Sequence, residues 1–398
     1  ASRAAPGAQT CLPKGDQQLP VQKEDRTTTW YVNQTGLTWT LAKTATITVE
    51  NQAGIYETTS DNDIRILGNI TATGTSVGVG VSFQGSDSTV EIAESSRIEA
   101  DSVAISARGN GSAIVNRGTL VGDARGIDSD FGGHLDNFGT IRSNDTAILY
   151  RGSGSTIDNR GRIIGNNCGI GVGSDAVITN AEHASITVVN ELGLALFLNT
   201  GATVYNHGTL AGGYGIFGAA SDTLVVNASG GAISGTTDGI FLGNGTATIR
   251  NHGTIAGKLY AILTEDDIQT VRNTGSIRGN VYLGNGDDIF DTRNGRVNGT
   301  IEGGRGDDTY RVSNPDVQIR EVDEDSFDTI ESTVSFKAPE NVEKLKLIGH
   351  RDANAIGSAA GDIIYGNDGD NKIIGKGGSD ILTGRAGNDI LIGGAGSD

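Results

Sequence analysis

The sequence is poor in the residues that fill a conventional globular core. Its 398 residues include no methionine, only 5 prolines and 5% aromatic side chains, whereas 61 residues are glycine. An enzyme built on a thick mixed core has a different composition, and so much glycine is typical of a chain with many tight turns. The composition therefore favours a repetitive architecture rich in turns.

Cysteine and long apolar runs are also scarce. Cys11 and Cys168 are the only cysteines, which excludes a disulfide scaffold, and we expect both thiols to be unpaired. The longest run of apolar residues and glycine, 192–198, is far shorter than the roughly 20 residues of a membrane-spanning helix, so no membrane span is expected. The first residues lack a signal-peptide pattern, so either a leader has been removed or export uses the other end.

Positive charge is the third deficit. The formal net charge is -18, which argues against nucleic acid and anionic membranes as partners. Residues 283–398 contain 22 acidic and 12 basic side chains, a local net charge of -10. Cations are the natural counterpart of this segment.

A repeat runs through the middle of the chain. The phrase Asn-x-Gly-Thr/Ser/Arg-Ile/Leu recurs, with two looser copies, at intervals of 21 to 26 residues. It begins at Asn116, Asn137, Asn159, Asn180, Asn206, Asn227, Asn251 and Asn273. Such a period indicates a stack of similar structural units.

Each unit contains two further β-rich pieces. A small residue followed by a branched apolar one stands about ten residues after each Asn, as in Gly126-Ile127 and Ala147-Ile148, and a third short piece precedes the next Asn. A unit of three short strands cannot bury its apolar side alone but can stack on its neighbours. We therefore predict an all-β fold, a parallel β-helix of either hand, in which the recurrent Asn side chains form a hydrogen-bonded ladder.

The chain divides into four predicted segments. Residues 1–35 do not follow the period and are expected to form a flexible arm and a cap over the open end of the solenoid. Residues 36–282 are predicted to form about ten rungs, and 283–356 a β-rich connector with isolated turns of a second repeat. Residues 357–398 form a β-roll on this interpretation.

The second repeat has a period of nine, Gly-x-x-Gly-x-Asp-x-apolar-x. It begins at 357, 366, 375, 384 and 393, and its sixth position holds Asp362, Asn371, Asp380, Asp389 and Asp398. Single copies at 283 and 303 contain Asp288 and Asp308. Four consecutive intervals of nine are not a chance pattern.

Calcium explains this pattern best. It takes six to eight oxygen ligands, which carboxylates and the exposed carbonyls of glycine turns provide. The candidate side-chain ligands are Asp288, Asp308, Asp362, Asp368, Asn371, Asp380, Asp389 and Asp398. The candidate backbone ligands are Gly357, Ala359, Gly366, Gly375, Gly377, Gly384, Ala386, Gly393 and Ala395.

Successive nonapeptides should turn on opposite sides of the roll, so that one ion is shared by turns 18 residues apart. Asp362 and Asp380 then lie on one side, and Asn371 and Asp389 on the other. Ile364, Ile373, Leu382 and Leu391 are expected to face inward. The neutral Asn371 should weaken its site.

The array at 357–398 resembles the repeats-in-toxin (RTX) family, whose GGxGxDxUx repeats form calcium-bound β-rolls. The segment GGRGDDTYRVSN at 303 and the stretch DTIESTVSFKAPENVEKLKLIG at 328 resemble the connector that often precedes such arrays. Asn371 and Ala360 depart from the family pattern. The resemblance implies calcium as the ligand, export by type I secretion, and a location outside the cell or on its surface.

Three classes of function remain open. We expect a non-catalytic structural or adhesive protein that self-associates or binds cell-surface polysaccharide. A polysaccharide lyase or epimerase is the second class, and a toxin or bacteriocin fragment the third. Candidate catalytic groups are Asp128, Asp130 and His134, then Glu182 with His183, and Glu265 with Asp266 and Asp267, but solvated acids at turns explain them better.

A serine-hydrolase pattern occurs once. Residues 74–78 match GxSxG, but they lie in an alternating Val/Gly stretch with no helix after it. The strand-turn-helix context of a nucleophile elbow is therefore missing. No catalytic residue is predicted.

Overall fold

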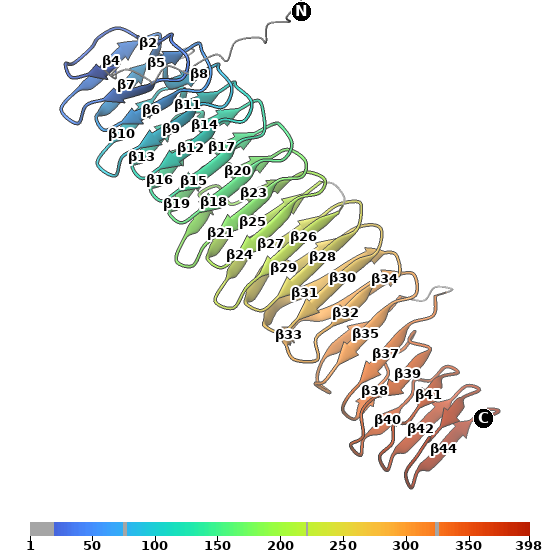
Figure 1. Cartoon of the computed structure of the whole chain (residues 1–398). Coiled ribbons are helices and arrows are strands. Elements are labelled where there is room, and N and C mark those ends of the chain that lie inside the picture. Colours follow the sequence, from blue (N-terminus) through green and yellow to red (C-terminus); the bar gives the residue numbers. More distant parts are fainter. Residues whose placement is uncertain (1–19, 75–77, 220–221, 323–325) are drawn as a thin grey trace, which may run out of the picture.

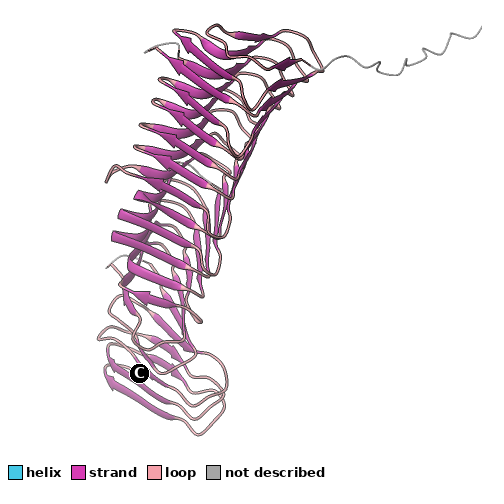
Figure 2. Cartoon of the chain, turned by 90° about the vertical axis from the view of Figure 1, so that its left-hand side faces the viewer, coloured by secondary structure: helices cyan, strands magenta, loops and turns pink. Residues whose placement is uncertain are grey.

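The computed structural model describes residues 20–74, 78–219, 222–322 and 326–398, and none of these residues lies in a helix. The strands run parallel and stack as a β-solenoid of about 17 turns, which confirms the predicted fold (Figure 1). At roughly 4.8 Å per rung the stack is about 80 Å long. Figure 2 shows that it bends gently along its length.

The first sheet contributes one strand to each rung. Its 18 strands run from one end of the described solenoid to the other. They are β1 (Val21–Gln22), β3 (Thr38–Leu41), β6 (Asp63–Ile66), β9 (Thr89–Ile92), β12 (Ala113–Asn116), β15 (His134–Asn137), β18 (Thr156–Asn159), β21 (Val177–Asn180), β24 (Thr203–Asn206), β26 (Thr223–Asn227), β28 (Ala247–Asn251), β30 (Gln269–Asn273), β32 (Ile289–Asp291), β35 (Thr309–Val312), β37 (Thr329–Ser332), β39 (Lys344–Leu347), β41 (Ile363–Tyr365) and β43 (Ile381–Thr383).

The second sheet has 22 strands and supplies the other two strands of each early rung. They are β2 (Trp30–Val32), β4 (Thr46–Glu50), β5 (Ala53–Glu57), β7 (Asn69–Thr73), β8 (Val79–Phe83), β10 (Arg97–Ala100), β11 (Val103–Ala107), β13 (Thr119–Gly122), β14 (Arg125–Ser129), β16 (Thr140–Ser143), β17 (Thr146–Tyr150), β19 (Arg162–Gly165), β20 (Cys168–Val172), β22 (Ser185–Val188), β23 (Leu194–Leu198), β25 (Thr209–Gly218), β27 (Ala232–Leu242), β29 (Thr254–Thr264), β31 (Ser276–Asn285), β33 (Arg296–Asn298), β34 (Thr300–Arg305) and β36 (Gln318–Arg320).

The three-strand rung that the repeat predicts holds as far as β23 and then changes. In β25, β27, β29 and β31 the second and third strands of a rung join into one strand of 10 or 11 residues. The register of β25 against β27 shifts between Gly212 and Tyr214. A β-bulge therefore stands where earlier rungs have a corner between their second and third strands. The rungs of these joined strands therefore have two strands each, whereas the next rung again has a separate β33 and β34.

A third sheet replaces the second in the last rungs. It contains β38 (Phe336–Lys337), β40 (Asn354–Ile356), β42 (Lys372–Gly377) and β44 (Ile390–Ala395). Among the described strands, β36 pairs with β34 but not with β38, whereas the first sheet passes this point unbroken. The first sheet also crosses the predicted boundaries near residues 282 and 356, and those boundaries stay predictions.

The Asn ladder is present as predicted. Each Nδ2 donates to the Oδ1 of the next Asn at 2.7 to 2.9 Å, from Asn116 through Asn137, Asn159, Asn180, Asn206, Asn227 and Asn251 to Asn273. These side chains are at most 1% exposed. Because a buried amide must find partners, identical residues in register satisfy one another from rung to rung.

The core is an apolar ladder inside the tube. Ile114, Leu135 and Ile157 are directly paired on neighbouring first-sheet strands and are no more than 1% exposed. The same row continues to Phe290 and Tyr310 in the later rungs. Stacking of like side chains supplies the burial that one rung lacks.

Part of the predicted cap is described. In residues 20–35, β1 pairs with β3 and β2 pairs with β5, so this segment covers the first full rung. Trp30 and Trp39 pack edge to face there with ring centroids 5.9 Å apart. The predicted arm and the first part of the predicted cap, residues 1–19 with Cys11, lie outside the described residues, as do residues 75–77 of the serine motif.

Candidate calcium sites

Alternate nonapeptides lie on opposite sides of the roll. β41 and β43 belong to the first sheet, and β42 and β44 to the third. Ile364 and Ile373 are fully buried and Leu382 packs against the core, as expected. Leu391 is 47% exposed instead, because β44 pairs with β42 alone.

The sixth-position side chains join rungs 18 residues apart. The backbone N–H of Asp362 donates to Oδ1 of Asp380 at 2.8 Å, and that of Asp380 donates to Oδ1 of Asp398 at 3.1 Å. On the other side the N–H of Asn371 donates to Oδ1 of Asp389 at 2.9 Å. The second oxygen of Asp380 is buried and has no hydrogen-bond partner among the described residues.

The first glycine of each nonapeptide leaves room for this second oxygen. A Cβ added at Gly375 would overlap Oδ2 of Asp380 and would lie 2.7 Å from the carbonyl oxygen of Gly393. A Cβ at Gly357 would likewise overlap Oδ2 of Asp362 and lie 2.7 Å from the carbonyl oxygen of Gly375. A carboxylate oxygen and a carbonyl oxygen from two rungs therefore converge on each space.

The same arrangement recurs on the opposite side. The amide oxygen of Asn371 and a carboxylate oxygen of Asp389 stand over the first glycines Gly366 and Gly384. A carboxylate oxygen of Asp398 stands over Gly393 in the same way, on the side of Asp362 and Asp380. Hard oxygen donors and an orphaned carboxylate oxygen suit calcium, and the array offers no nitrogen or sulfur ligand in these spaces. The residues present thus fit calcium.

The third position of the nonapeptide is glycine or alanine in four of five copies, so that only its backbone carbonyl could bind calcium there. A Cβ on Gly377 would lie 3.3 Å from the carbonyl oxygen of Ala359 and 3.9 Å from that of Ala395, so these carbonyls stack in one column. Ala386 holds the same position on the other side. Asp368 is the exception, because its half-exposed carboxylate contacts Nδ1 of His350 at 2.9 Å.

Asn371 is more than a weakened ligand. Its Nδ2 donates to the carbonyl oxygen of Ala353 and to Oδ1 of Asn367, both at 2.9 Å. Its Oδ1 accepts from the N–H of Asn367 at 2.8 Å. The amide therefore links two rungs by hydrogen bonds, which a carboxylate could not do towards a carbonyl.

Asp288 and Asp308 belong to the same column as the array carboxylates. The N–H of Gln269 donates to Asp288 at 2.6 Å, the N–H of Asp288 to Asp308 at 2.8 Å, and the N–H of Asp308 to Asp328 at 2.8 Å. The next rung continues the column, because the N–H of Asp328 donates to Glu343 at 2.7 Å. Each acid immediately precedes a first-sheet strand.

Burial dominates the electrostatics of this column. It raises the pKa of Asp288 and Asp308 to about 8 and that of Asp328 to about 6, with neighbouring carboxylates adding to the effect. Burial also raises the pKa of Asp362. Such groups favour either a proton or a bound cation.

Asp328 and Glu343 were missed in the sequence, although a signal exists. Asp288, Asp308 and Asp328 are spaced 20 residues apart, and each precedes a Thr or Ile and then a buried apolar residue. Asp328 lacks the glycines of a nonapeptide, so the motif search passes over it.

The upstream catalytic candidates do not converge. Asp128 is not the solvated turn acid that the sequence indicates, because it lies within β14 with its side chain only 3% exposed. Arg108, Arg125 and Arg151 contact its carboxylate. Arg108 also binds Asp130, and this hydrogen bond lowers the pKa of Asp130.

The other candidate acids and histidines lie elsewhere. His134 contacts Asp136 at 3.1 Å and Thr156 at 2.7 Å on the outer face of the first sheet. Glu182 and His183 are exposed on a turn, 3.6 Å apart. Asp266 accepts from Asn285, at an exposed turn that also contains Glu265 and Asp267.

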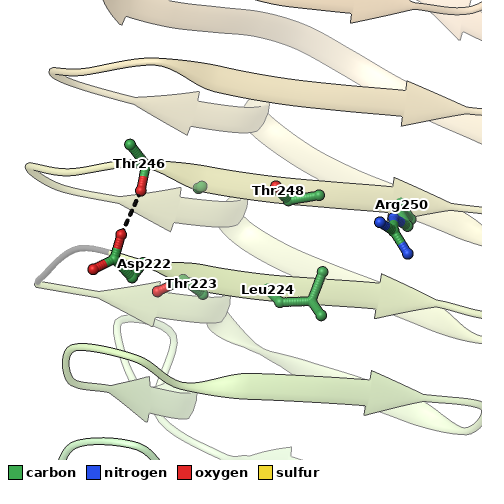
Figure 3. Close-up of a pocket in the computed structure, with 7 residues that line it drawn as sticks. Asp222, Thr223, Leu224, Thr246, Thr248 and Arg250 are labelled. Atoms are coloured by element: carbon green, nitrogen blue, oxygen red, sulfur yellow. Dashed lines mark hydrogen bonds between the residues drawn. The ribbon is translucent and has the colours of Figure 1, made fainter.

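A surface groove lies on β26 and β28. Its volume is about 330 Å³, and Asp222, Leu224, Thr246 and Arg250 are among its lining residues (Figure 3). Thr246 donates to Oδ1 of Asp222 at 2.6 Å. A single acid tied to a threonine is no acid–base pair.

Comparison with known proteins agrees with the geometry of the array. Residues 365–398 match the family of the RTX calcium-binding nonapeptide repeat, in four copies. No curated protein and no solved structure matches the chain. No helix among the described residues is long and apolar enough to cross a membrane.

The fold and the glycine spaces define a calcium-binding protein of the parallel β-solenoid class. Residues 365–398 consist of RTX calcium-binding repeats, and these repeats follow a parallel β-helix. Calcium is the ligand of the repeats.

Proposed function

We propose that the protein is a structural or adhesive component of the cell exterior, such as a surface-layer, filament or matrix protein. RTX repeat proteins are typically secreted by a type I route, which supports this location. The carrying observation is the uninterrupted stack of similar rungs, because it provides length and repetitive surface rather than one convergent site. Calcium would stiffen the last rungs.

An aromatic ridge on the second sheet supports the adhesive part of the proposal. Phe197, Phe217 and Phe241 are in register on β23, β25 and β27, and the rings of Phe217 and Phe241 stack with centroids 4.8 Å apart. Tyr214 packs edge to face against Phe217 at 5.4 Å. Flat, half-buried rings suit the apolar faces of sugar rings, so polysaccharide is the proposed partner.

Retention on immobilised alginate and pectin tests the ridge. Phe217→Ala should shorten retention, whereas Phe138→Ala, at the exposed turn between β15 and β16, should leave it unchanged. Equal retention of both variants and the original chain would reject the ridge as the binding surface.

Sedimentation and electron microscopy in calcium test the structural part. Concentration-dependent filaments or sheets are expected. A monomer at every concentration would reject assembly.

A polysaccharide-active enzyme is the second candidate, because one acid lies within the aromatic ridge. Asp238 pairs in register with Tyr214 and Tyr260 and is 3% exposed. Burial raises its pKa, which suits a general acid. Product released from alginate or pectin by the original chain but not by Asp238→Asn would favour this function over the structural one.

A further inference from the structure

Glu321 occupies a position that is glycine in the nonapeptide turns. Glu302 pairs with Arg320, so Glu321 stacks on Gly303, 18 residues earlier. In the array, Gly375 stands in this relation to Gly357. The Glu321 side chain is 6% exposed, and its Oε2 accepts from the N–H of Gly304 at 3.4 Å.

Two further oxygens point at the space beside Gly303 that a side chain would fill. A Cβ added at Gly303 would overlap Oδ2 of Asp308 and the hydroxyl of Tyr310. The Tyr310 hydroxyl donates to Oε1 of Glu321. Oδ2 of Asp308 is buried in a residue only 1% exposed and has no hydrogen-bond partner among the described residues.

Asp328 is the third carboxylate beside Asp308 and Glu321. Its Oδ1 accepts from the N–H of Asp308 at 2.8 Å, and its Oδ2 accepts from Ser326 at 3.2 Å. One carboxylate oxygen from each of Asp308, Glu321 and Asp328 lies within 4.8 Å of the other two. All three residues are at least 94% buried.

Backbone N–H groups and hydroxyls donate to the three carboxylates. The donors among the described residues are the N–H groups of Asp288, Gly304 and Asp308 and the hydroxyls of Tyr310 and Ser326. Burying charges of one sign together is costly unless a proton or a cation compensates them. An all-oxygen donor set favours calcium over zinc or copper.

We propose that Asp308, Glu321 and Asp328 form a buried calcium site that is separate from the nonapeptide array. The site lies where the second sheet ends at β36 and the third begins at β38. An ion there joins the rung of β34 and β35 to the rung of β36 and β37, at the point where sheet pairing on the side of β36 is interrupted. It continues the calcium column inward from the RTX repeats.

Calcium stoichiometry of the full chain tests the site. Equilibrium dialysis of the original chain and of Glu321→Gln, which keeps the size of the side chain, should show the loss of one calcium per chain. Asp316→Asn, an exposed acid of the same segment, should keep the full number. An equal number of bound ions in all three proteins would overturn the proposal.

Terbium luminescence provides a second test if Glu321→Gln does not fold. The Tyr310 hydroxyl reaches the site, so terbium bound there should be excited through this ring. Tyr310→Phe, which keeps the ring, should remove a distinct part of the emission, and the matched Tyr365→Phe in the array should leave that part in place. Emission unaffected by Tyr310→Phe would contradict the site.

Discussion

At the scale of single residues, Asn371 provides hydrogen bonds between rungs at a position where most copies of the nonapeptide have a carboxylate for calcium. Its amide binds the carbonyl of Ala353 on the preceding rung, while Asp389 accepts from its backbone on the following one. A neutral side chain here costs calcium affinity but needs no calcium to hold the rungs together. We therefore expect asparagine at position 371 to keep these two rungs together in the calcium-free protein.

The variant Asn371→Asp should reverse this balance. It should tighten calcium binding, because a carboxylate replaces an amide over Gly366. Without calcium it should lower the free energy of unfolding by about 1 kcal/mol or more, the value of the lost bond to Ala353. Calorimetric titration and melting with and without calcium measure both effects, and weaker calcium binding would contradict the assigned geometry.

The sequence predicted the acids of the regular repeats but not their extensions. Asp362, Asp380 and Asp389 are found by their period of nine. Glu321 and Glu343 have no such period, because the turns that carry them differ in length, and a neighbour one rung away in space is 15 to 20 residues away in sequence. Only the register of the strands brings them into the column.

At the scale of elements, the glycine turns are the part on which calcium affinity depends most. Gly375→Ala puts a methyl group onto Oδ2 of Asp380, so we expect roughly tenfold weaker calcium binding or worse, about 1.4 kcal/mol. Gly377→Ala is the matched control, because alanine occupies the same position in three other copies. Calcium titrations that do not separate these two variants would refute the role of the first glycine.

The Asn ladder should stabilise the upstream rungs in a similar, calcium-independent way. Asn159→Ala removes the side chain between Asn137 and Asn180 and leaves buried partners unsatisfied, which costs on the order of 1 to 3 kcal/mol. Asn190→Ala, at an exposed amide, should change stability little. Denaturant unfolding of the two variants distinguishes a stabilising ladder from a neutral one.

The buried acidic column makes the calcium-free connector sensitive to pH. Its acids titrate near 4 in the unfolded chain but at about 8 in folded Asp288 and Asp308, so the folded state binds more protons between these values. The protonated acids therefore stabilise the folded state. Their contribution to the free energy of unfolding is complete below about pH 4 and is lost as the pH rises through about 8. Melting of calcium-stripped protein should show this fall, and Asp308→Asn should flatten it; a rise with pH would contradict the burial of these acids.

At the scale of the whole molecule, the sequence predicted the architecture and missed two transitions. The recurrence of Asn and of branched apolar residues was sufficient for a stack of three-strand rungs. The fusion of strands at β25 and the exchange of sheets between β36 and β38 were not predicted, because both depend on how corners pack rather than on which side chains face inward. The acidic connector lies at the second of these transitions.

Two kinds of interaction hold the rungs of the solenoid together: asparagine amides upstream and calcium with carboxylates downstream. Calcium removal should therefore affect the two parts differently. The buried asparagine amides of the upstream rungs have hydrogen-bond partners without an ion. By contrast, buried carboxylate oxygens of Asp380 in the array and of Asp288 and Asp308 in the connector have no hydrogen-bond partner among the described residues.

Hydrogen–deuterium exchange of the full chain with and without calcium tests this central claim most directly. We expect calcium removal to speed exchange in β41 to β44 and in the connector strands β35 to β37, while β12 to β30 keep their protection. Unchanged exchange in residues 357–398, or an equal loss of protection along the whole solenoid, would contradict it.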